Sequence, residues 1–334
     1  MVNSRCATLV AAILLVSACS DTGGPSGAPT ADIAFVQNGD IYTTSLDSGA
    51  VPHLIARDLA GPSWSPDGKL LAAVRNGDTT GIFLMNAVGG DLHQLTKIDW
   101  GAFELSGPAW KPDGQVITFS TRCHCCNCRL TTDIWRINVD GTDETLFADD
   151  FYTDLKWSPD ESKYTLQEYD LIFIQNSDGT NRFGLVQGCC VDWSPDGADI
   201  AYANNNRLHL VEPTGTNDRI LPVLGDSVYA YAPKWSPDGA RIAFLRVPES
   251  GEFPAQVPMI MNADGTGQMV LAPGIQTNSS VDWSSDGQYL GFTGFASQAD
   301  VDANLSQLYS VRPDGTDLHP ITEKGAICCF DWRP

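Results

Sequence analysis

Residues 193–215, WSPDGADIAYANNNRLHLVEPTG, give the clearest indication of the fold. This stretch opens with Trp-Ser-Pro-Asp-Gly and continues as two β-rich runs, ADIAYA and RLHLVE, which polar residues separate. Pro-Asp-Gly between apolar runs is a strong hairpin signal, because glycine accepts the positive φ that tight turns need. The stretch therefore predicts short antiparallel strands joined by tight turns.

The same pattern recurs along the chain. The motifs start, complete or in variant form, at Trp64, Trp110, Trp157, Trp193, Trp235, Trp283 and Trp332. Each of the first six leads into two β-rich runs, a turn that is often Asp-Gly-Thr, and a further run. A strand ending at the Trp and three strands after it make a four-stranded blade, and repeats of about 40–45 residues with this content predict a β-propeller.

The two ends of the chain set the number of blades. The chain stops just after Trp332, whereas residues 31–55 have the later strands of a unit without a preceding Trp motif. Together the two pieces complete one blade. We therefore expect an all-β propeller over residues 31–334, with seven four-stranded blades and closure through the N- and C-terminal strands. Six or eight blades are the alternatives, because the motif after Trp157 follows unusually soon.

These repeats resemble the PD40 (WD40-like) repeat of TolB-like β-propellers, in which W-S-P-D-G precedes I-A-F and a later D-G. The resemblance covers nearly all of residues 31–334 and implies the fold more strongly than a function. The namesake of the family has an additional N-terminal α/β domain that contacts an envelope complex, and related prolyl oligopeptidases have a hydrolase domain. Neither a region for such domains nor a G-x-S-x-G elbow is apparent in this sequence.

The N-terminal residues predict export. Arg5 precedes an apolar stretch at residues 6–18 that is too short to span a bilayer, and LVSAC follows. This resembles a bacterial lipobox, which implies a signal peptide at residues 1–18, lipidation of Cys19 and a flexible tether at residues 19–31. An ordinary signal peptide is the alternative. We expect a cell-envelope protein, on the periplasmic side or the cell surface, that contacts the membrane through its lipid anchor only.

Composition narrows the choice of partners. The chain has a formal net charge of −21 and is 43% hydrophobic. A packed globular fold is expected, and nucleic acid is excluded as a partner because phosphate binding needs clustered Lys and Arg. We expect a monomer.

Eight cysteines follow Cys19, and a histidine accompanies them. The candidate disulfide or metal residues are Cys123, His124, Cys125, Cys126, Cys128, Cys189, Cys190, Cys328 and Cys329. All map to the rim of the propeller that has the loops after strands two and four of each blade, which we call the variable face. Disulfides, a Zn²⁺ or Cu⁺ site and free redox-active thiols are the three interpretations. Because the three clusters are not on neighbouring blades, we expect mostly local bonds, with bridges inside the loop at residues 123–128. The two Cys-Cys pairs should either form vicinal disulfides or point one sulfur to each side of the strand.

Three aspartates directly precede a motif tryptophan on innermost strands: Asp192, Asp282 and Asp331. A ring of such carboxylates near the axis is a candidate site for Ca²⁺ or another hard cation. The alternative is that they are solvated or hydrogen-bonded residues lining the channel. The aspartates inside the turn motifs are interpreted as turn chemistry.

The favoured function is a binding scaffold that presents the variable face to a protein, peptide or glycan, because long loops on a rigid frame are common binding sites. An enzyme is less favoured, since the sequence has no complete catalytic set. The alternatives are a metal-dependent hydrolase or lactonase with the axial carboxylates as ligands, and a thiol-based metal or redox sensor. No cofactor is firmly expected, and Ca²⁺ and Zn²⁺ are the candidates.

Overall fold

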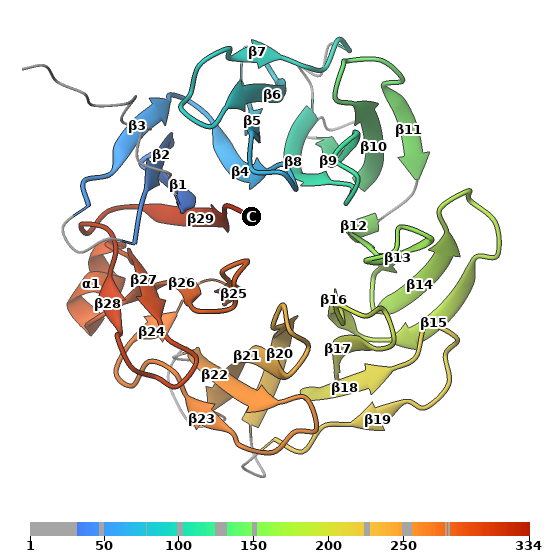
Figure 1. Ribbon diagram of the computed structural model, residues 1–334, viewed down its shortest axis with the longest axis vertical. Coiled ribbons are helices and arrows are strands. Elements are labelled where there is room, and N and C mark those ends of the chain that lie inside the picture. Colours follow the sequence, from blue (N-terminus) through green and yellow to red (C-terminus); the bar gives the residue numbers. More distant parts are fainter. Residues whose placement is uncertain are drawn as a thin grey trace, which may run out of the picture. The chain divides into compact units, whose positions relative to one another are not determined.

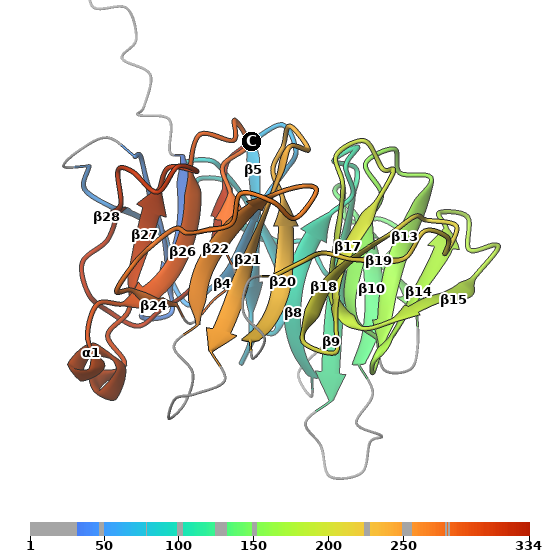
Figure 2. The same ribbon diagram turned by 90° about the horizontal axis from the view of Figure 1, so that it is seen from below.

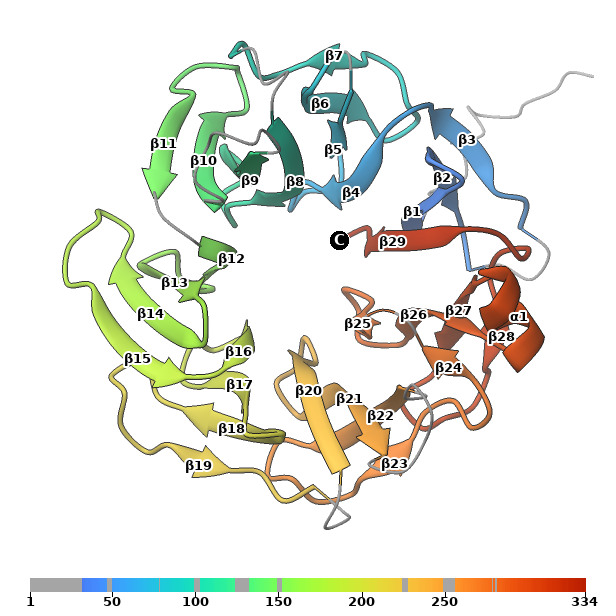
Figure 3. The same ribbon diagram turned by 180° about the vertical axis from the view of Figure 1, so that it is seen from behind.

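The computed structural model describes residues 32–46, 50–77, 79–98, 103–123, 132–148, 152–223, 228–248, 256–277, 279 and 281–334. These residues belong to one compact unit that comprises residues 31–334. Seven antiparallel sheets surround a common axis, as the two views down the ring show (Figure 1, Figure 3). The predicted seven-bladed β-propeller is confirmed. Among the described residues, no helix has the length and apolar character needed to cross a membrane.

We number the blades from Trp64 and name the strands of each from the axis outwards. Blade 1 consists of β4 (Ala60–Trp64), β5 (Leu70–Arg75), β6 (Gly81–Asn86) and β7 (His93–Gln94). Blade 2 consists of β8 (Phe103–Trp110), β9 (Val116–Cys123), β10 (Thr132–Asn138) and β11 (Thr145–Ala148). Blade 3 consists of β12 (Tyr152–Trp157), β13 (Lys163–Glu168), β14 (Leu171–Asn176) and β15 (Phe183–Gln187). Blades 4 and 5 consist of β16 (Cys189–Trp193), β17 (Ile200–Asn204), β18 (Arg207–Val211) and β19 (Arg219–Ile220); and β20 (Val228–Trp235), β21 (Arg241–Pro248), β22 (Val257–Asn262) and β23 (Met269–Val270).

Blade 6 has its innermost strand in two pieces, both paired with the same neighbour. Its elements are β24 (Gln276–Thr277), β25 (Asp282–Trp283), β26 (Leu290–Phe295), the short helix α1 (Gln298–Ala303), β27 (Gln307–Val311) and β28 (His319–Pro320). In the side view, α1 and the end of β9 lie on one side of the ring, and the C-terminus lies on the other (Figure 2). The side that has α1 is the variable face.

Blade 7 closes the ring as predicted. It combines β29 (Ile327–Trp332) from the C-terminus with β1 (Ile33–Gln37), β2 (Asp40–Thr44) and β3 (His53–Ala56) from the N-terminus. β1 and β29 are antiparallel, with Ile33 opposite Trp332. The amide of Arg333 also donates to the carbonyl of Asp32 at 2.9 Å, so hydrogen bonds join the two ends of the chain directly.

The W-S-P-D-G motif is explained by turn chemistry. In blade 4 the Ser194 hydroxyl donates to the Asp196 carboxylate at 2.6 Å, and the same carboxylate accepts the Ala198 amide at 3.0 Å. Gly197 then takes a φ of +70°, which glycine adopts without strain. The Asp-Gly-Thr turns work similarly, since Thr266 donates its hydroxyl and its amide to Asp264. These hydrogen bonds lower the pKa of both aspartates, and the turn interpretation is confirmed.

Neighbouring blades pack through buried side chains that both blades contribute, and four of the motif tryptophans add hydrogen bonds to this packing. The indoles of Trp110, Trp193, Trp283 and Trp332 donate to a carbonyl of the preceding blade. In each case that carbonyl belongs to the residue just before the Trp of the preceding blade. The repeat therefore places one indole over the inner strand of its neighbour around much of the ring.

Candidate functional site

Most innermost strands contain a β-bulge shortly before the motif tryptophan. Its first residue has a positive φ in blades 1, 2, 4 and 5, where it is Gly61 (+56°), Gly107 (+60°), Cys190 (+61°) and Ala232 (+52°). Glycine adopts this conformation freely, whereas side chains with a Cβ pay about 1 kcal/mol or more. Blade 4 thus has a cysteine at a position that glycine fills elsewhere in the ring.

Two of the three predicted cysteine clusters lie within the described residues. Cys189 and Cys190 are in β16, and Cys328 and Cys329 are in β29. None of these four is in a disulfide in the structure, and the sulfur atoms of each pair face one another at 2.7 Å and 2.9 Å respectively. The backbone of Cys123 ends β9, and His124, Cys125, Cys126 and Cys128 lie outside the described residues, as does Cys19. Vicinal disulfides in the two pairs stay a prediction.

The three predicted axial aspartates lie on inner strands, but two of them hold neighbouring blades together. The Asp192 carboxylate in β16 accepts the amide of Trp235 in the next blade at 2.8 Å. In the same way, Asp331 accepts the amide of Trp64 at 2.6 Å. Asp282 instead accepts the amide of Trp283 beside it at 3.0 Å. The hydrogen-bonded alternative therefore describes Asp192 and Asp331.

The axial aspartates share their surroundings with a lysine. The Lys234 ammonium lies 3.7 Å from the Asp192 carboxylate, whose side chain is 20% exposed. Packed protein around the carboxylate raises the pKa of Asp192, and the positive charge of Lys234 opposes this effect. The pKa of Asp331 is raised to about 7, mainly by burial and also by the negative charge of Asp282. The hydrogen bond from the Trp64 amide has the opposite effect and lowers this pKa. The axis thus has opposite charges side by side.

In the part of the chain that the structure describes, no group of three or more His, Cys, Asp or Glu side chains is placed to hold a metal ion. This applies to the axial aspartates and to the two cysteine pairs. The axial cation site therefore stays a prediction that the described geometry does not support.

A pocket of about 650 Å³ opens on the variable face where blades 3, 4 and 5 meet. Three tyrosines and three asparagines dominate its wall. The lining residues are Tyr169, Asp170, Gln187, Gly188, Cys189, Ala203, Asn204, Asn205, Asn206, Tyr229, Ala230, Tyr231 and Val247. We call it the variable-face pocket. Its concave shape, with aromatic rings and a few polar groups, is typical of small-ligand sites.

Tight hairpins position the polar side chains of this pocket. Asn205 and Asn206 form the two-residue turn between β17 and β18, with φ of +46° and +66°, values that asparagine tolerates well. Tyr169, at the turn between β13 and β14, has a φ of +52° and is 66% exposed. A bulky residue in this conformation is rare, and such strain concentrates at functional sites.

Hydrogen bonds between blades hold the pocket in shape. The Gly188 amide donates to the Asp170 carbonyl at 2.6 Å, which joins blade 3 to the chain entering blade 4. The Ala230 amide donates to the Asn206 carbonyl at 3.0 Å, which joins blade 5 to blade 4. Burial, together with the nearby Cys190 sulfur, raises the pKa of Tyr231, so its phenol stays protonated at neutral pH. The walls are therefore preorganised.

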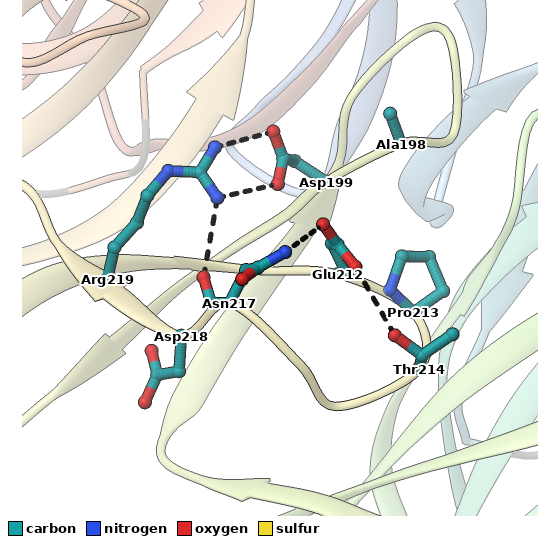
Figure 4. A pocket seen from close by; sticks show the side chains of 8 residues that line it. All are labelled: Ala198, Asp199, Glu212, Pro213, Thr214, Asn217, Asp218 and Arg219. Carbon is teal, nitrogen blue, oxygen red and sulfur yellow. Dashed lines mark hydrogen bonds and ion pairs between the residues drawn. The ribbon is translucent and has the colours of Figure 1, made fainter.

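A second pocket, of about 710 Å³, lies beside the tight turns of blade 4 (Figure 4). We call it the turn-face pocket. These charged groups of the pocket already have partners: Arg219 contacts both carboxylate oxygens of Asp199, at 3.0 and 2.7 Å, and Glu212 accepts hydrogen bonds from Thr216 and Asn217. This arrangement stabilises the turns and offers a ligand few uncommitted polar groups.

The residues of the variable-face pocket and one further hydrogen-bond network were not predicted from the sequence. Tyr202 donates to Asp218 at 2.8 Å, and His209 lies 3.1 Å from the same carboxylate. This network joins β17 and β18 to the segment before β19. The turn signal N-N-N could have drawn attention to residues 204–206, whereas nothing local in the sequence places Tyr169 and Tyr229 on the same pocket.

No family model and no curated protein matches the sequence. Solved structures do. An oligogalacturonate lyase in complex with manganese has 14% identity and a TM-score of 0.62, covering 82% of this chain and 82% of that chain. TolB from Acinetobacter baumannii has 16% identity and a TM-score of 0.54, covering 91% and 67%. A putative TolB from Agrobacterium tumefaciens has 19% identity and a TM-score of 0.53, covering 78% and 96%. At these identities the likeness extends to the fold, and TolB-like propellers are among its structural neighbours.

Proposed function

We propose that this protein is a non-enzymatic binding module of the bacterial cell envelope, exported and lipid-anchored at Cys19, which seats a neutral glycan in the variable-face pocket. The observation that supports it most directly is the lining of that pocket, where exposed tyrosine rings stand beside turn asparagines. Phenol rings offer flat apolar surfaces, and amides both donate and accept hydrogen bonds. Sugar rings have apolar faces and hydroxyl edges that match these two kinds of group.

Charge favours a neutral ligand over an acidic one. The chain has a net charge of −21, and one of its carboxylates, that of Asp170, lies at the pocket itself. A polyanion would therefore meet repulsion over most of its approach. The concave shape favours the end of a glycan chain over a flat protein surface.

The test is binding of the purified protein to an array of neutral oligosaccharides, followed by calorimetry with the best binder. Tyr229 is 41% exposed and lines the pocket, so Tyr229→Ala should weaken binding about tenfold, because an aromatic contact of this kind contributes on the order of 1–2 kcal/mol. Asn206→Gly should also weaken binding, since glycine keeps the positive φ and removes only the amide.

Arg219→Ala, in the turn-face pocket, is the matched control and should leave binding unchanged. Binding that Arg219→Ala weakens as much as Tyr229→Ala would place the ligand elsewhere. Binding to a peptide array, with no response to any neutral glycan, would overturn the assigned ligand class.

A further inference from the structure

The Cys328–Cys329 pair is a second chemical feature, separate from the variable-face pocket. Successive side chains of a regular strand point to opposite faces, which would keep two adjacent sulfurs apart. In β29 the pairing with β1 shifts, so that Phe330 lies opposite Phe35 while Ile327 lies opposite Gln37. The two cysteines therefore face a single residue of β1, and this bulge brings their sulfurs to 2.9 Å.

The two thiols of this pair differ in their surroundings. Cys328 is exposed, whereas Cys329 is partly buried against the apolar core between blades 7 and 1. The hydrogen bond from Cys329 lowers the pKa of Cys328 to about 7, and the same contact, with burial, raises the pKa of Cys329. Cys328 thus loses its proton first and is the accessible nucleophile, while Cys329 keeps its proton and stands within reach of it.

We propose that Cys328 and Cys329 form a redox-active pair that exchanges with organic disulfides, with Cys328 as the attacking thiol and Cys329 as the resolving thiol. The Cys328 thiolate attacks one sulfur of a disulfide RSSR. The RS–SR bond breaks, a Cys328–SR mixed disulfide forms, and the leaving thiolate takes a proton from solvent.

Cys329 then loses its proton to solvent and attacks the Cys328 sulfur, which expels the second RS⁻ for protonation. The products are a Cys328–Cys329 disulfide and two RSH, so two electrons pass from the pair to the substrate. The reverse sequence oxidises two thiols with the same atoms. Exchange of this kind needs no group beyond the disulfide or thiol substrate.

The Cys189–Cys190 pair gives an internal comparison. Its sulfurs are as close, at 2.7 Å, but both cysteines are partly buried and Cys189 forms part of the pocket wall. Access for a disulfide is therefore poorer at this pair, and access governs the rate of exchange. Cys328 should react first when both pairs are reduced.

The test uses the reduced full chain and two probes, glutathione disulfide and the disulfides of insulin. Because the chain has 10 cysteines, the products are mapped on peptides. Trypsin cleavage after Lys324 releases the C-terminal residues 325–334, which contain both cysteines of the pair, because the Arg333–Pro334 bond resists trypsin. We expect this peptide to lose two hydrogens, as an internal disulfide. At pH 7, Cys328 should react about threefold faster than an ordinary exposed cysteine, since its larger thiolate fraction outweighs its lower nucleophilicity.

Two variants separate the roles. Cys329→Ser should leave glutathione attached at Cys328, because the resolving thiol is gone, whereas Cys328→Ser should abolish the fast reaction of this peptide. Cys190→Ser, in the other pair and outside the lining of the variable-face pocket, is the matched control and should change neither result. Reaction with glutathione disulfide supports the proposal. Whether insulin also reacts then shows if the pair accepts small-molecule disulfides only or protein disulfides as well. The proposal is overturned if neither probe reacts at Cys328, or if Cys329→Ser still yields a product without attached glutathione. Because the assay involves no glycan, its failure would leave the proposed binding function untouched.

Discussion

Asp331 provides a direct test of how the ring closes. Its carboxylate lies between the first and last blades and accepts the Trp64 amide at 2.6 Å. Burial raises its pKa to about 7, from an ordinary value of about 3.9. The folded protein therefore binds this proton more tightly than the unfolded chain does. The stabilising contribution of the protonated group is complete below pH 3.9 and is lost as the pH rises through 7.

Between pH 5 and pH 8 this loss is about 2–3 kcal/mol of the free energy of unfolding, worked from the two pKa values at 1.36 kcal/mol per unit. Asp331→Asn keeps an oxygen that can accept the Trp64 amide but has no proton to lose. We therefore expect the stability of the variant, relative to the native protein, to improve by about 2–3 kcal/mol from pH 5 to pH 8. Urea unfolding followed by tryptophan fluorescence at both pH values measures this difference.

Asp314→Asn is the matched control. The Asp314 carboxylate accepts the hydroxyl and amide of Thr316 in an exposed turn, and these bonds lower its pKa, so it stays ionised from pH 5 to pH 8. Its replacement should cost the same at both pH values. If the stability difference between Asp331→Asn and the native protein were also independent of pH, burial at the closing blade would not raise the pKa of Asp331, and the prediction would be wrong.

Two other predictions concern the repeat itself. Trp332→Phe should lower the free energy of unfolding by about 1 kcal/mol more than Trp64→Phe does. The reason is that the Trp332 indole donates to the Asp282 carbonyl, whereas the Trp64 indole nitrogen has no hydrogen-bond partner among the described residues. Equal losses of stability in chemical denaturation would contradict this prediction. Ala232→Gly should stabilise the protein by about 0.5–1 kcal/mol, because glycine relieves a φ of +52°, whereas Ala243→Gly in the fully buried part of β21 should lower the melting temperature.

Much of the fold followed from local sequence signals. Trp, Pro-Asp-Gly and Asp-Gly-Thr mark the ends of strands, and the hydrogen bonds that explain them lie within a few residues of each motif. The closing blade was also predictable, because each end of the chain had the strands that the other lacked. Such features depend on short-range chemistry, which a sequence displays directly.

The binding site required the tertiary structure. Tyr169, Asn206 and Tyr229 come from three blades and meet only because the ring brings the ends of their strands together. The aspartates before the tryptophans were visible in the sequence, but whether Asp192 and Asp331 would bind an ion or the amide of the next blade depends on distances of a few ångströms.

The cysteine pairs show the same division. Two Cys-Cys dipeptides precede a motif tryptophan at the same offset in the sequence, and this alone predicts that they lie at the start of innermost strands on the variable face. That the sulfurs of each pair face one another, and that Cys328 is exposed while Cys329 is partly buried, depends on the packing of the folded chain. The reason is that a one-residue shift in strand pairing reverses the side to which a residue points, and that shift depends on the neighbouring strand.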